Sequence, residues 1–68
     1  MDSGAKKMGK NMKRIRTAKR ITQGDISRAL NVARSFVSNI ENGKTNPTLA
    51  TMTKLARVLG VPTEELIK

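Results

Sequence analysis

Asn31 and Val32 separate two short segments with helical periodicity, and this brief connection limits the fold more than any other feature of the sequence. Helices over residues 23–30 and 33–42 can be joined so closely only if the chain changes direction abruptly. Next to Gly, Asn is the residue that most readily takes the left-handed conformation that ends a helix in one step. The sequence therefore predicts two helices that meet at a tight turn.

A further helix is predicted on the N-terminal side of this pair. Over residues 9–19, Met12, Ile15 and Ala18 recur at helical spacing, and basic residues cover the remaining face. Thr22 is suited to cap the helix at 23–30, and Asp25 suits the positive end of that helix dipole. The segments up to residue 42 thus form three consecutive helices.

Two more helices are expected after Gly43, which is suited to end the helix at 33–42. Thr48 caps the first of them, which ends at Gly60, and Pro62 opens a short helix over residues 63–67. The apolar stripe of the longer helix consists of Leu49, Met52, Leu55, Ala56 and Leu59. The expected fold is all-α: five compact helices, with residues 1–7 as a flexible basic arm and residues 8–68 as one domain.

The composition excludes several classes of protein. A chain of 68 residues supports a single core, because it buries only about 60% of its unfolded surface. Cysteine and histidine are both absent, so no disulfide, thiol nucleophile or usual zinc site is available, and no enzyme activity, metal or cofactor is expected. No apolar run is long enough for a membrane span or a signal peptide. We expect a soluble, intracellular protein.

The charge indicates a polyanionic partner. There are 14 Lys and Arg against 5 Asp and Glu, which gives a net charge of +9, and residues 1–20 hold eight of the bases but only one acid. Basic surfaces bind nucleic acid through counterion release. RNA and single strands are disfavoured because Phe36 is the only aromatic residue, which leaves no stacking platform.

The helix over residues 33–42 has one apolar face and one hydrogen-bonding face. At about 100° per residue, the polar side chains fall within roughly 140° of one another: Arg34, Ser35, Ser38, Asn39 and Asn42. Ser and Asn are poor helix formers, so they weaken the helix without a local benefit. Arg pairs with guanine and Asn with adenine in the major groove of DNA, and Ser bonds to either. This face is suited to reading base pairs.

With these residues in place, the sequence resembles the phage-repressor (Cro/C1, or Xre) family of helix-turn-helix regulators. The resemblance covers about residues 8–67 and rests on "ITQGDISRALNV" and on "VSNIENGKTNPTLATMTKLARVLGV". It implies a lambda-repressor-like fold and sequence-specific binding of double-stranded DNA. It further implies a cytoplasmic repressor, encoded by a bacterium or a phage, that binds a palindromic operator as a homodimer. We expect the contact surface between protomers to include Val61, Leu66 and Ile67, because their apolar atoms exceed what the short last helix needs for its own docking.

The resemblance also assigns roles to individual residues. Base reading is expected from Arg34, Ser35, Ser38 and Asn39, and phosphate contacts from Gln23, Asn42, Lys44 and Thr45. Arg16 and Glu41 correspond to a structural ion pair of the family, and Lys6, Lys7 and Lys10 are candidate contacts from the arm. Ala33 departs from the usual Ser or Thr cap, at a cost of about 1 kcal/mol. An antitoxin that binds a protein partner as well as its own promoter fits the same residues and stays an alternative.

Overall fold

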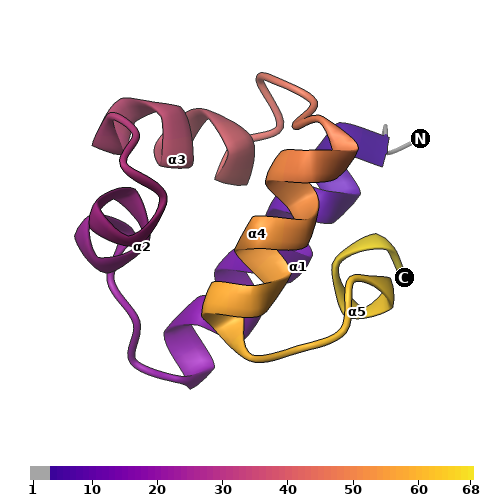
Figure 1. Cartoon of the computed structure of the whole chain (residues 1–68). Coiled ribbons are helices and arrows are strands. Elements are labelled where there is room, and N and C mark those ends of the chain that lie inside the picture. Colours follow the sequence, from indigo (N-terminus) through magenta and orange to yellow (C-terminus); the bar gives the residue numbers. More distant parts are fainter. Residues whose placement is uncertain (1–3) are drawn as a thin grey trace.

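The computed structural model describes residues 4–68, which form five helices and no strand (Figure 1). These helices are α1 (Gly4–Ala18), α2 (Gln23–Leu30), α3 (Arg34–Glu41), α4 (Leu49–Leu59) and α5 (Glu64–Ile67). The expected all-α fold of five compact helices is confirmed. Helices α2 to α5 begin and end within one residue of their expected limits.

All five helices contribute to one hydrophobic core. Helix α1 contacts α3 and α5, while α2 contacts α3 and α4. Figure 1 shows α2 and α3 on one side of α1 and α4, with α5 on the other. The buried apolar residues are Met8, Met12, Ile15, Ile26, Val37, Ile40, Leu55, Ala56, Leu59 and Leu66. Burial of these side chains is the main source of stability, since the chain has no cysteine.

Helix α1 is longer than the apolar spacing predicted. It begins at Gly4 rather than near Gly9, so residues 4–7, expected in a flexible arm, are helical. Met8 explains the extension, because it is buried and lies one turn before Met12 on the core side of the helix. Ala18, expected on that side, is exposed. The rest of the expected arm, residues 1–3, lies outside the described residues.

Two leucines occupy environments opposite to those expected. Leu49, placed in the apolar stripe of α4, is 74% exposed, whereas Leu66, assigned to a contact surface, is completely buried. Leu66 is held from its backbone as well, since the Asn11 side-chain nitrogen donates a hydrogen bond of 3.0 Å to its carbonyl oxygen. Helix α5 thus uses Leu66 to dock on α1 and leaves Ile67, 56% exposed, for other contacts.

Candidate nucleic-acid interface

The turn between α2 and α3 has the geometry that Asn31 predicts. Asn31 lies in the left-handed region, with φ 56° and ψ 49°. The next N–H, that of Val32, donates to the carbonyl oxygen of Ser27 at 3.0 Å. This ends α2 in one step, and α3 begins at Arg34. The two helices are thereby held against each other as one unit.

The N-terminus of α2 is fixed by a capping box. The backbone N–H of Asp25 donates to the Thr22 hydroxyl oxygen at 2.9 Å, and the backbone N–H of Thr22 donates to the Asp25 carboxylate at 2.9 Å. Hydrogen bonds from Thr22, its backbone N–H foremost, and the charge of Arg28 hold the pKa of Asp25 below its ordinary value. Asp25 is therefore ionised at neutral pH and stabilises the first turn of α2.

Helix α3 turns a polar face to solvent. Val37 and Ile40 are completely buried, and Phe36 packs against the core at its edge. Of the four expected base-reading residues, Arg34, Ser35 and Asn39 are exposed. Ser38 is half-buried, and its hydroxyl oxygen accepts a hydrogen bond of 3.3 Å from the side-chain nitrogen of Asn42. The face is therefore open to an external partner along the length of α3.

Arg16 and Glu41 form the ion pair that joins α1 to the end of α3. Arg16 Nε donates to Glu41 Oε2 at 2.5 Å, and a second guanidinium nitrogen donates to Oε1 at 3.1 Å. Arg16 also donates to the carbonyl oxygen of Ile21 at 2.9 Å. The side chains are only 12% and 2% exposed, so the pair lies inside the protein. A paired guanidinium and carboxylate with this geometry fix the orientation of α3 relative to α1.

Gln23 is held by the same carboxylate. Its side-chain nitrogen donates to Glu41 Oε1 at 3.0 Å, which brings α1, α2 and α3 together at one acidic group. This contact was not foreseen, because the spacing along the chain gives no sign that Gln23 and Glu41 meet. The side chain expected to bind phosphate is thus also a structural donor.

Gly9 is a second residue whose role the sequence did not reveal. A Cβ built at this position would collide with the carbonyl oxygen of Ile40 and lie 2.6 Å from that of Glu41. Helix α1 therefore reaches the backbone of α3 only because residue 9 has no side chain. The close contact complements the Arg16–Glu41 pair in fixing the position of α3.

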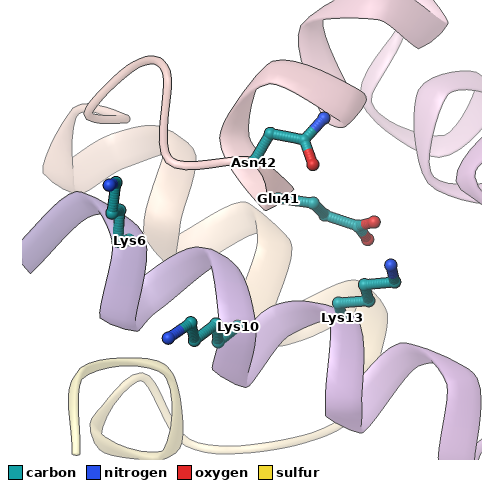
Figure 2. A pocket seen from close by; sticks show the side chains of 5 residues that line it. All are labelled: Lys6, Lys10, Lys13, Glu41 and Asn42. Carbon is teal, nitrogen blue, oxygen red and sulfur yellow. The ribbon is translucent and has the colours of Figure 1, made fainter. Parts of the chain in front are cut away.

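The remaining expected contacts lie around the C-terminal end of α3. Gly43 has φ +70° and ends the helix as predicted, with Lys44 and Thr45 in the turn that follows. Figure 2 shows that Lys6, Lys10 and Lys13 of α1 line an open hollow beside Glu41 and Asn42. Lys13 was not among the expected site residues, and Lys7 does not line this hollow. The structure brings the polar end of α3 and the lysine row of α1 to one surface.

Other kinds of site find no support among residues 4–68. That part of the chain holds no group of His, Cys, Asp and Glu side chains able to bind a metal ion. None of its helices is both long and apolar enough to pass through a membrane. The polar face of α3 and the basic surface beside it are the features that define the chemistry of the molecule.

Two helices joined by such a turn, the second with an exposed polar face, are the characteristic feature of helix-turn-helix proteins, which are DNA-binding regulators of transcription. The chain belongs to the helix-turn-helix family, which matches residues 12–66. Relatives of this kind are regulators of transcription and not enzymes.

Two relatives illustrate the sequence similarity. The HTH-type transcriptional regulator y4dJ of Sinorhizobium fredii (strain NBRC 101917 / NGR234) is 36% identical over 62 residues, which cover 91% of this chain and 80% of the relative. The immunity repressor protein of Bacillus phage phi105 is 30% identical over 60 residues. That match covers 88% of this chain but 42% of the repressor, so the phage protein is much longer than the shared domain.

Two solved structures illustrate the similarity of the fold. The restriction-modification controller protein C.AhdI from Aeromonas hydrophila superposes with a TM-score of 0.85 at 32% identity, over 91% of this chain and 94% of the controller. The controller C.Esp1396I, solved as a tetramer with its natural 35 base-pair operator, gives a TM-score of 0.80 at 25% identity over the whole of both chains.

Proposed function

We propose that the protein is a repressor that binds a palindromic operator in double-stranded DNA as a homodimer. Helix α3 of each protomer enters the major groove, where Arg34, Ser35, Ser38 and Asn39 read the base pairs. The protein acts in the cytoplasm, where it controls transcription from the site it occupies.

The exposed polar face of α3 carries this proposal. Arg34 stands at the first position of α3, the end of a reading helix that points into the groove. Its guanidinium is suited to a bidentate contact with guanine O6 and N7, and the Asn39 amide to adenine N6 and N7. The opposite face of α3 is packed into the core, so the reading face has one fixed orientation.

The surrounding residues supply contacts to the phosphate backbone. Asn42, Lys44 and Thr45 follow the reading helix, and the backbone N–H groups at the start of α2 favour an anion. Gln23 contributes one amide hydrogen, since the other is bonded to Glu41. From the basic α1, Lys6, Lys7 and Lys10 extend the same surface. Phosphate contacts set the register and carry no sequence information directly.

Dimeric binding is supported by the size of the reading surface and by related proteins. One eight-residue helix spans too few base pairs for useful specificity, whereas two half-sites double the sequence that is read. The related C.Esp1396I was solved as a tetramer in complex with its operator, and the phi105 relative is a repressor. The exposed Ile67 on α5 offers an apolar contact between protomers.

Selection of bound duplexes from a random library tests the proposal directly. We expect enrichment of an inverted repeat whose half-site centres lie about one helical turn, 10–10.5 bp, or a multiple of it apart. Selected sequences with one unrepeated half-site would contradict dimeric reading. A library that shows no enrichment, although the protein binds DNA, would contradict sequence-specific regulation.

A further inference from the structure

The dipeptide Asn42-Gly43 ends α3. Asn42 is the C-cap of this helix, is exposed, and lines the hollow between α1 and α3 (Figure 2). An asparagine followed by glycine is prone to deamidation, because the backbone nitrogen of a residue without a side chain reaches the asparagine side-chain carbon with little hindrance. The end of α3 therefore carries a reactive group that DNA binding does not use as such.

The fold requires glycine at position 43. Its φ of +70° is one that other residues rarely adopt. A Cβ at this position would also lie 2.6 Å from Cγ of Lys6 and 2.9 Å from Cα of the same residue. A larger residue after Asn42 would hinder attack on its side chain, but no such residue fits against α1. The packing of α1 thus keeps the reactive dipeptide in the chain.

The other asparagines have neighbours or surroundings that oppose the reaction. Asn31 and Asn39 precede β-branched residues, whose side chains crowd the attacking nitrogen. Asn46 precedes a proline, whose nitrogen has no hydrogen to lose. Asn11 lies inside α1, and its side-chain nitrogen is bonded to the backbone of α5. Asn42 is therefore the asparagine with the least hindered neighbour.

Two hydrogen bonds hold the dipeptide in the closed turn. The backbone N–H of Gly43 donates to the carbonyl oxygen of Ile40 at 3.1 Å, and Nδ2 of Asn42 donates to the Ser38 hydroxyl oxygen at 3.3 Å. While its N–H is bonded in this way, the Gly43 nitrogen is not free to attack. Helix ends open locally at little cost in free energy, so the turn opens far more often than the whole protein unfolds.

We propose that Asn42 is a site of spontaneous deamidation, and that the reaction converts the protein irreversibly into a form that binds DNA weakly. The modification depends only on the dipeptide and on the opening of the turn. Its effect on DNA binding rests on the proposed function. Bound DNA holds the turn closed, so the reaction removes free protein and leaves bound protein active.

The reaction has two steps, with water as the only co-reactant. In the opened turn, the Gly43 nitrogen loses its proton to solvent and forms a bond to Cγ of Asn42. The bond from Cγ to Nδ2 breaks, and Nδ2 takes up a proton and leaves as ammonia, which yields a cyclic imide. Water then adds to one of the two imide carbonyl carbons and breaks its bond to nitrogen, which leaves aspartate or isoaspartate at position 42.

Both products change the surface assigned to phosphate contact. A carboxylate replaces the amide of Asn42, and it adds negative charge at the C-terminal end of α3, where the helix dipole disfavours it. The same charge repels the phosphates of DNA. Isoaspartate also lengthens the main chain by one carbon just before Gly43, which packs on α1. Each of these changes weakens DNA binding.

Peptide mapping of the whole protein tests the proposal. Trypsin cleaves after Lys and Arg, so the peptide of residues 35–44 contains Asn39 and Asn42, and that of residues 45–54 contains Asn46. Three samples are incubated at mildly alkaline pH: folded protein, folded protein with duplex DNA, and protein unfolded in urea. Mass spectrometry then detects the replacement of NH2 by OH at each asparagine, and a sample digested at the start gives the background.

We expect conversion of Asn42 in the folded protein, with Asn39 and Asn46 unchanged over the same time. Duplex at about ten times its Kd should slow the conversion about tenfold, because DNA binds the closed turn and lowers the open population by that factor. Conversion of Asn42 no faster than that of Asn39, while the unfolded chain is converted, would overturn the proposal. An equal rate with and without bound duplex would overturn the protection by DNA.

The variant N42D reproduces one product, and N46D places the same charge in the exposed loop outside the assigned contacts. N42D should bind a mixed-sequence duplex at least about tenfold more weakly than the original protein, because a carboxylate then faces phosphate. N46D should weaken binding much less. Equal affinities of N42D and N46D would overturn the effect of the modification on DNA binding.

The DNA-free samples separate this result from the fate of the proposed function. Their conversion is measured by mass alone, so it is informative even for a protein that prefers no sequence. Failure of the library selection with conversion of Asn42 would contradict specific regulation and leave the modification site intact. An enriched inverted repeat without conversion of Asn42 would contradict only the modification site.

Discussion

Glu41 shows how one side chain connects the stability of the protein with the position of α3. Its carboxylate is 2% exposed and bonds to Arg16 of α1 and Gln23 of α2. Removal of one partner from a buried ion pair typically costs about 3–5 kcal/mol, because the other charge stays buried and unpaired. Variants of Arg16, Glu41 or Gln23 therefore perturb folding and are poor tests of DNA contact.

Arg34 is a better test, because it is exposed and forms no hydrogen bond or ion pair through its side chain within residues 4–68. R34A should weaken binding to the best selected site by about 1–3 kcal/mol and relax the preference at one base pair of each half-site. The removal of a bidentate interaction with guanine accounts for both effects. Binding assays on the selected site and on its single-base variants measure them.

Lys44→Ala is the matched control at the residue scale, since Lys44 is also basic and lies just past the same helix. It should weaken binding to all duplexes alike, because a phosphate contact carries no sequence information directly. If R34A lowered the affinity for specific and mixed DNA equally, Arg34 would be a backbone contact and not a base-reading residue.

At the scale of the helices, Gly9 and Gly4 allow a direct comparison on α1. Ala is favoured over Gly in a helix by about 1 kcal/mol. At Gly9 the added methyl meets the backbone of Ile40 and Glu41, whereas nothing lies within 4 Å of the same position at Gly4. G9A should therefore lower the free energy of unfolding by about 1–3 kcal/mol, as overpacking does, and G4A should leave it unchanged or slightly higher.

Urea denaturation of the two glycine variants, followed by circular dichroism, measures this difference. An unchanged stability of G9A would mean that α1 and α3 move apart without cost. In that case the close contact would not fix the position of α3.

The start of α3 offers a second prediction at this scale. Ala33 is the N-cap of α3 and provides no side-chain hydrogen bond, as its identity predicts. Ala33→Ser should raise the free energy of unfolding by about 1 kcal/mol, because the hydroxyl oxygen can accept an unpaired N–H of the first turn. Thermal and urea unfolding measure the gain, and Ala29→Ser, at an exposed position inside α2, is the control without a cap.

Local sequence signals predicted the helices, but most of the contacts that join them were not foreseen. The Arg16–Glu41 pair was expected only from the family resemblance. Asn31, Gly43 and Gly60 have positive φ where helix ends were expected, because each end depends on residues adjacent in sequence. The left-handed conformation of Arg20 was missed, since Arg carries no such preference. Likewise, the Gln23–Glu41 bond and the close approach at Gly9 join residues far apart in the chain, which a single sequence does not reveal.

At the scale of the whole molecule, the basic hollow and the proposed contact between protomers lie on different elements. The basic hollow lies between α1 and the end of α3, whereas the exposed Ile67 lies on α5, which Figure 1 shows on the side opposite α2. Because Leu66 is completely buried, the proposed contact surface between protomers is smaller than the sequence suggested, and we expect it to depend on Ile67 and the half-buried Val61. Such a small surface favours a dimer that assembles on DNA.

Ile67→Ser tests this arrangement, because it removes an exposed apolar side chain without a change in charge. On the selected inverted repeat, the variant should bind more weakly by about 1–2 kcal/mol, as expected when a partly buried Ile side chain is removed. On a duplex with one half-site, the variant and the original protein should bind equally well, since no second protomer is present. Gel-shift titrations on the two duplexes distinguish these outcomes. Equal weakening on both duplexes would indicate damage to the fold or to DNA contact, and no weakening on either would place the dimer contact elsewhere than α5.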